Sequence, residues 1–227
     1  ITCFDLSGNF VWSTFVKDPT TDFHDYVRMA AGCDGLYITA EAGAGTLFNN
    51  GTTYPATATS DALFVAQLDK GTGGVNWVQF GTTNNQSEFT GTDIAVGPRN
   101  EIQVAGRYKG TVTYQTHAMT ANATQDAFLL TLKRNGDWVN MEGLDGSGIA
   151  ECNAVAVGPL GAVSLGGKFQ GNYSVGGTTY NAAAQNDGFI AQAQSGARAL
   201  GLKDPSRWQA PTSVCQNSGA IDLSTFL

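Results

Sequence analysis

Residues 126–138 read Asp-Ala-Phe-Leu-Leu-Thr-Leu-Lys-Arg-Asn-Gly-Asp-Trp, and related versions of this stretch begin at Asp61 and Asp187. The leading aspartates are 65 and then 61 residues apart. A period of this length indicates one supersecondary unit copied along the chain. The sequence therefore predicts a repeat protein. Its repeats occupy 1–202, as units at about 1–60, 61–125 and 126–186 and a partial unit at 187–202, and an irregular tail follows at 203–227.

Each unit continues with the same series of turn and strand signals. A turn that contains Gly or Asn follows the Asp-led strand, as Asn135-Gly136 does in the quoted stretch. Such residues adopt the positive φ that a tight hairpin requires. Two short apolar strands come next, at 92–96 and 102–105 in the second unit. A last strand follows a glycine in every unit, at Gly45, Gly110 and Gly171.

The Asp-led strand of the quoted stretch is apolar on both faces. One face carries Phe128, Leu130 and Leu132. The other face carries Ala127 and Leu129. A strand of this kind is typical of a sheet covered on both sides, and stacking such sheets radially gives a β-propeller. We therefore expect an all-β fold, a β-propeller whose blades of about 60 residues hold four to five short antiparallel strands.

The order of these motifs resembles the bacterial seven-bladed β-propeller repeat family. Members of that family carry a D-A-F-[VL]-x-x-[LIV]-[DN]-x-x-G-x-x-x-W motif, an alternating apolar strand and a closing [VT]-x-G. The match covers about residues 1–202 and is clearest in the second and third units, whereas the first unit begins inside the Asp-led strand. Because the family is recognised by its repeat, the resemblance implies an extracellular or surface propeller and supplies no catalytic residue.

Three units and the start of a fourth leave three arrangements open. The chain is a fragment of a longer propeller, or its tail at 203–227 supplies closing strands for a small four-bladed ring. In the third arrangement, incomplete arcs of blades pair between subunits, because a partial propeller exposes edge strands that invite pairing. The fragment and the small ring are the two arrangements that the sequence favours equally.

Composition narrows the classes of partner. Charged residues are only 14% of the chain, the net charge is −7, and the twelve Lys and Arg residues are scattered. No basic stripe is present to neutralise phosphates, so nucleic-acid binding is not expected. No apolar run reaches the roughly 18 residues of a membrane-spanning helix. The abundance of Gly, Thr and Asn is typical of secreted β proteins, which places the chain outside the cell or on its surface.

The four cysteines are far apart in the sequence, which excludes a paired-cysteine metal or redox motif. An even number in a secreted β protein suggests two disulfides, and sequence alone leaves three connectivities. We favour Cys3–Cys33, because both belong to the first unit, and then Cys152–Cys215, which would tie the tail to the third unit.

The repeated aspartates Asp61, Asp126 and Asp187 are the weak candidates for a metal site, since Ca²⁺ prefers carboxylate and carbonyl oxygens. We favour a structural role for them, a hydrogen bond that fixes the turn before the strand. The recurring tryptophans are expected to pack between blades, and these are Trp12, Trp77 and Trp138. No cofactor is expected.

Two residues outside the repeat pattern are candidates for surface contacts, Trp208 and His24. An acidic loop in the third unit contains Glu142, Asp145 and Glu151, and paired carboxylates can hydrolyse glycosides when they face each other. The sequence carries no catalytic triad order, zinc-protease motif or nucleotide-binding loop.

These observations predict a non-enzymatic extracellular β-propeller that serves as a structural, self-assembling or adhesion module through protein–protein contacts. Its contacts are expected at blade ends, where loops vary on a rigid scaffold. The alternative is a carbohydrate-active or carbohydrate-binding propeller, which would act on or bind a glycan.

Overall fold

The computed structural model describes residues 1–17, 27–53, 62–84, 87–144, 146–175, 178–182 and 186–194. These residues form strands and turns only, so no helix among them could cross a membrane. The all-β prediction is confirmed. The strands are β1 (Thr2–Phe4), β2 (Phe10–Ser13), β3 (Val16–Lys17), β4 (Arg28–Ala31), β5 (Leu36–Ala42), β6 (Leu47–Phe48), β7 (Ala62–Leu68), β8 (Val75–Thr83), β9 (Glu88–Val96), β10 (Ile102–Lys109), β11 (Thr111–Tyr114), β12 (His117–Thr120), β13 (Asp126–Leu132), β14 (Trp138–Leu144), β15 (Ala150–Val157), β16 (Ala162–Phe169), β17 (Asn172–Val175), β18 (Thr178–Asn181) and β19 (Asp187–Gln194).

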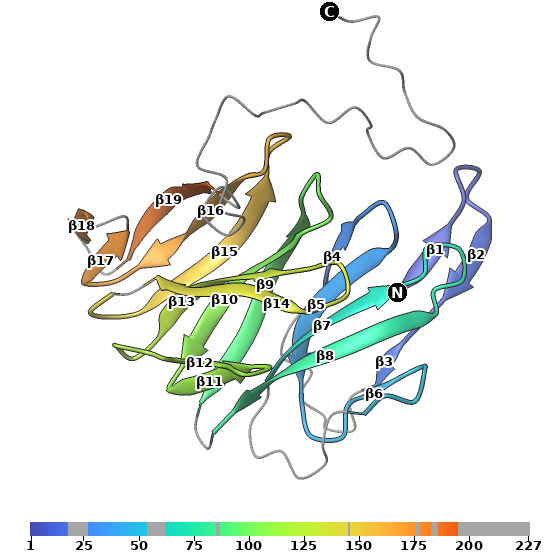
Figure 1. The fold of residues 1–227 in the computed structure, drawn as a ribbon, viewed down its shortest axis with the longest axis horizontal. Helices are drawn as coiled ribbons and strands as arrows, with labels where there is room; N and C mark the ends of the chain where they lie inside the picture. The colour runs from blue at the N-terminus through green and yellow to red at the C-terminus, as the bar shows by residue number, and fades with distance from the viewer. Residues whose placement is uncertain are drawn as a thin grey trace, which may run out of the picture.

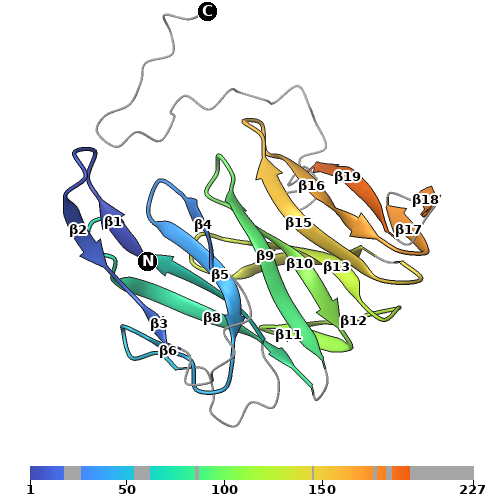
Figure 2. The same ribbon diagram turned by 180° about the vertical axis from the view of Figure 1, so that it is seen from behind.

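The strands form a row of similar antiparallel sheets (Figure 1). The first sheet is β4-β5-β7-β8, the second is β9-β10-β13-β14, and the third is β15-β16-β19. Each Asp-led repeat is the third strand of its sheet, so one sheet combines strands from two consecutive sequence units. The N-terminal hairpin, β1–β2, lies at one end of the row and the third sheet at the other, as Figure 2 shows from behind.

Glycine turns set the hairpins as predicted. The turns between the third and fourth strands, and the equivalent turn of the N-terminal hairpin, hold Gly8, Gly73 and Gly136 at φ values of 82°, 70° and 84°. Positive φ is inexpensive for glycine and strained for residues with a Cβ. The three periodic glycines that precede the last strand of each unit also have positive φ; they are Gly45, Gly110 and Gly171.

Neighbouring sheets pack face to face and are also joined by a hairpin that one sheet contributes to its neighbour. Between its second and third strands the second sheet extends a hairpin, β11–β12, and β11 pairs with β8 of the first sheet. Equivalent pairings occur at both ends of the row. β6, which follows β5 of the first sheet, pairs with β3, and a bridge joins Gly146, which follows β14, to Tyr173 on β17. Each sheet is therefore extended by backbone hydrogen bonds from the sheet that follows it.

The cores lie between sheets rather than within one. On β13, Phe128, Leu130 and Leu132 are buried against the first sheet. The opposite face of the same strand contributes Ala127 and Leu129 to the core shared with the third sheet. The predicted division of this strand into two apolar faces is thus confirmed.

The described residues do not close into a ring. The small four-bladed ring expected as one arrangement is not formed by them, because no described strand of the third sheet pairs with the N-terminal hairpin. The closing strands considered at 203–227 lie outside the described residues. What the structure establishes is an all-β row of antiparallel sheets, repeated with the period that the sequence predicts.

Candidate functional site

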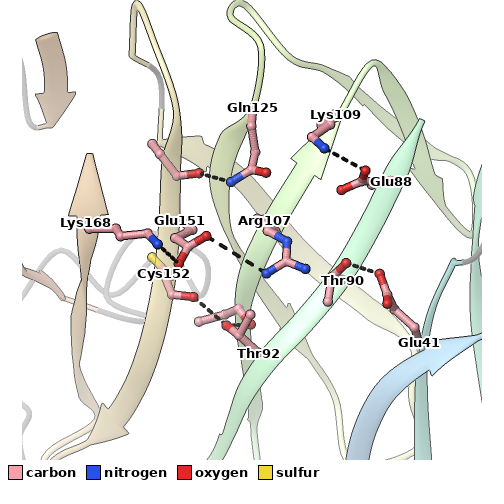
Figure 3. Close-up of polar contacts among 12 residues, drawn as sticks. Glu41, Glu88, Thr90, Thr92, Arg107, Lys109, Gln125, Glu151, Cys152 and Lys168 are labelled. Atoms are coloured by element: carbon pink, nitrogen blue, oxygen red, sulfur yellow. Dashed lines mark hydrogen bonds and ion pairs between the residues drawn. The ribbon is translucent and has the colours of Figure 1, made fainter. Parts of the chain in front are cut away.

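A polar seam links the second strand of each sheet to the first strand of the next sheet (Figure 3). Glu151 on β15 lies between two cations, with one oxygen 2.9 Å from Lys168 Nζ and the other 3.9 Å from Arg107 of the second sheet. Its side chain is only 13% exposed. Across the other junction, the Thr90 hydroxyl donates to Glu41 of the first sheet. These charges are satisfied within the protein and hold the sheets together.

A second set of contacts joins the sheets through β-bulges. β9 and β15 each carry an extra residue opposite a glycine-containing part of the next strand, Thr92 in β9 and Asn153 in β15. The Thr92 hydroxyl donates to the carbonyl oxygen of Cys152, and the Val155 amide donates to Asp93 Oδ2 over 2.8 Å. Since bulges free backbone groups from the ladder, the side chains of one sheet's bulge satisfy the backbone of the following sheet.

Asp126 is the repeated aspartate whose hydrogen bonds the structure shows, and its role there is structural. Asp126 is fully buried, and its carboxylate accepts the Asn122 amide at 2.7 Å and the Gly146 amide at 3.3 Å. This is the structural role that the sequence favours. Asp187 occupies the equivalent position on β19, paired with Phe169, and Asp61 lies outside the described residues. Among the described residues no three His, Cys, Asp or Glu side chains gather as a metal site.

The favoured disulfide pairings are wrong. Cys3 and Cys152 are both free thiols. Cys3 lies in the N-terminal hairpin opposite Trp12, whereas Cys152 is buried in the core between the second and third sheets. Membership of one sequence unit does not bring cysteines together, because each sheet draws its strands from two units. Cys215 lies outside the described residues.

The acidic loop does not form a catalytic pair in the described part of the chain. Glu142 is exposed on β14 and accepts from Asn140 Nδ2 at 2.6 Å, whereas Glu151 is on β15 of the next sheet between its two cations. Asp145 falls outside the described residues, and so do His24 and Trp208, the two candidates for surface contacts.

The tryptophans pack between sheets as expected, but only two of them are equivalent. Trp12 pairs with Cys3 and covers Gly73, and Trp77 pairs with Gln67 and covers Gly136 in the following sheet. Trp138 instead faces the preceding sheet, where its ring stacks on His117 with centroids 3.2 Å apart. Trp138 follows Asp126 by 12 residues whereas Trp77 follows Asp61 by 16, and the two tryptophans pair at different positions of their sheets.

Exposed apolar side chains mark the two ends of the row, and sequence reasoning missed them. Phe4 and Phe10 of the N-terminal hairpin are 59% and 62% exposed, with their rings edge to face at 6.5 Å. Ile190, on β19 of the third sheet, is 90% exposed. The sequence did contain a signal for these exposed residues. A strand that is apolar on both faces leaves one apolar face uncovered when it lies in the last sheet of a row.

No family model matches the chain, and no curated protein matches it. The assignment of a function therefore depends on the geometry of these two open faces.

Proposed function

We propose that this protein is a non-enzymatic β-propeller-type module that acts outside the cell, as a structural or adhesion component held by protein–protein contacts. The observation that carries the proposal is the placement of exposed apolar residues at both ends of the row, at Phe4, Phe10 and Ile190. Large exposed apolar groups at adjacent positions are typical of interaction surfaces. The resemblance to the seven-bladed propeller repeat supports both the propeller geometry and the extracellular location.

The contacts within the protein support the same proposal. Sheets in this row recognise one another through apolar faces, through exchanged hairpins and through bulge side chains that bind neighbouring backbone. The apolar faces and the paired hairpins recur along the row, and the bulge side chains join the second sheet to the third. An open face at either end is therefore suited to another protein surface of similar construction, with no ligand pocket required.

The experiment that tests the proposal compares it with the alternative, a carbohydrate-active or carbohydrate-binding propeller. Purified full-length chain should release no reducing sugar from a panel of bacterial, plant and animal polysaccharides and should give no specific hits on a glycan array. Hydrolysis that disappears in Glu142→Gln or Glu151→Gln, with folding retained, would overturn the proposal in favour of an enzyme. A specific glycan hit lost in Trp208→Ala would overturn it in favour of a lectin.

A further inference from the structure

The two open faces occupy positions that are buried contacts elsewhere in the row. In the second sheet Phe128 pairs with Gly106, and in the third sheet Phe189 pairs with Gly167. A Cβ on either glycine would collide with the same two groups, a backbone carbonyl of the first strand and the ring of that phenylalanine. The two sheets therefore align residue by residue, which places Ile190 at the position of Leu129.

That alignment identifies what the third sheet lacks. Leu129 is 7% exposed because the third sheet covers it, whereas Ile190 is 90% exposed. Its neighbours on the same face are also uncovered, since Gly188 and Ala154 are exposed. We call this surface of β15, β16 and β19 the trailing face. Every earlier sheet has its trailing face covered by the sheet that follows.

The N-terminal hairpin presents the opposite half of the same contact. A bulge brings Leu68 opposite Val75 in the first sheet and Leu132 opposite Trp138 in the second. These pairs pack toward the preceding sheet. The bulge in the hairpin places Phe4 opposite Phe10 in the same way. Leu68 and Leu132 are 0% exposed, whereas Phe4 is 59% exposed. We call the surface that carries the two phenylalanines the leading face.

We propose that the partner of this protein is a second copy of the same chain, joined head to tail, with the leading face of one copy on the trailing face of the next. This deepens the proposed function by naming its partner. Each contact inside the row joins a trailing face to a leading face, and the described part of the row presents one of each. Such an interface is heterologous, so it generates a closed ring or a filament according to the rotation between copies.

The trailing face is smaller and smoother than the internal ones. Gly166 and Gly188 stand where the second sheet has Ala105 and Ala127. A Cβ on either would meet nothing closer than 3.8 Å, so the face is open around Ile190. The leading face offers two phenylalanines, a larger pair than the Leu68 and Val75 of the first sheet and similar in size to the Leu132 and Trp138 of the second. Bulky rings on one copy thus match an open surface around a single isoleucine on the next.

The test uses full-length chain and two single variants, Phe10→Asp and Ile190→Asp. The native mass of the wild type, measured by light scattering over a hundredfold range of concentration, should exceed that of one chain. Each variant alone should dissociate at least about tenfold more readily, as expected when a central apolar contact is lost. Leu160→Asp is the matched control, because Leu160 is 63% exposed on a turn of the third sheet that lies off both faces. Circular dichroism verifies folding of every variant.

Mixing the two variants is the decisive step. Phe10→Asp retains an intact trailing face and Ile190→Asp an intact leading face, so an equimolar mixture should form one-to-one dimers that neither variant forms alone. A wild type that stays a single chain, or a mixture that contains only single chains, would overturn the head-to-tail proposal. Assembly that persists in both variants would overturn it too, while leaving the assembly function in place. Only the carbohydrate assays would overturn that function.

Discussion

β13 and β19 are the same strand in two neighbouring sheets, and their surroundings differ completely. Leu129 on β13 is 7% exposed, whereas Ile190, its counterpart on β19, is 90% exposed. The two side chains have nearly the same apolar area, and both strands begin with Asp and carry a Phe two residues later. Burial here is decided by the next sheet in the row and not by the strand itself. A repeat sheet is thus both a core element and a docking surface.

Replacing Phe128 or Phe189 by Ala should give the largest change in stability with which β13 and β19 can be compared. Phe128 is fully buried between two sheets, whereas Phe189 is half-buried and stacks on Tyr173 at 4.6 Å. Phe128→Ala should lower the free energy of unfolding by about 3–5 kcal/mol, and Phe189→Ala by roughly half as much, because less apolar area leaves water. Urea unfolding followed by tryptophan fluorescence measures both. Equal losses would show that the third sheet is as enclosed as the second.

The reactivities of the Cys152 and Cys3 thiols compare a buried junction between sheets with the N-terminal hairpin. Burial, with a smaller contribution from the charge of Glu151, raises the pKa of Cys152 to about 12. A raised pKa leaves the thiol protonated, so only about one in 10⁴ is ionised at pH 8. Since the thiolate is the reactive form, Cys152 should be alkylated at least about 100-fold more slowly than half-buried Cys3.

Iodoacetamide labelling followed by peptide mass spectrometry measures the two rates separately. Labelling in urea is the control, because unfolding should bring the rates together. Equal rates in the native protein would mean that the core between the second and third sheets opens readily, and would contradict the structure at that junction.

The sequence predicts the interior of this fold well. Its period locates the Asp-led strands, its glycines locate the positive-φ turns, and alternation along 127–132 assigns each side chain of β13 to the correct face. These features are local, so a single strand or turn carries enough information to predict them. They hold wherever a strand lies between two similar neighbours.

The tryptophan orientations, the cysteine pairs and the open faces depend on strand register and on which sheets are neighbours. The spacing of motifs along the sequence does not determine either. Trp138 pairs with Leu132, the last residue of β13, whereas Trp77 pairs with Gln67, one residue before the end of β7, so the two tryptophans face opposite ways. The favoured Cys3–Cys33 pair failed because one sheet combines strands of two sequence units. The open faces were missed because Ile190 belongs to the same pattern as Leu129, and only the three-dimensional order shows which of them ends the row.

Asp93 gives the next largest effect, at the bulge that holds the third sheet. Asp93→Ala removes the acceptor of the Val155 amide, and a buried donor without a partner costs about 1–3 kcal/mol. Asp93→Asn keeps one acceptor oxygen and should lose less. Ala154→Asp, the exposed equivalent in the third sheet, should change the free energy of unfolding by no more than about 0.5 kcal/mol.

Urea unfolding gives these three values, and hydrogen exchange at the Val155 amide reports the contact directly. Exchange should accelerate in Asp93→Ala and stay slow in Ala154→Asp. An unchanged exchange rate in Asp93→Ala would show that the bulge side chain does not hold the following sheet.

The smallest effect contrasts two glycines of the third sheet. Gly188 lies on the trailing face, where an added Cβ would meet only the Gly167 carbonyl at 3.8 Å. Gly188→Ala should therefore stabilise the single chain by about 0.5 kcal/mol, because it lowers the conformational entropy of the unfolded state. Gly167→Ala would instead place its Cβ 2.1 Å from the Glu151 carbonyl oxygen and should destabilise the sheet. Both are measured by urea unfolding at a concentration where light scattering shows single chains. A loss of stability in Gly188→Ala under those conditions would mean that the trailing face is already covered within one chain.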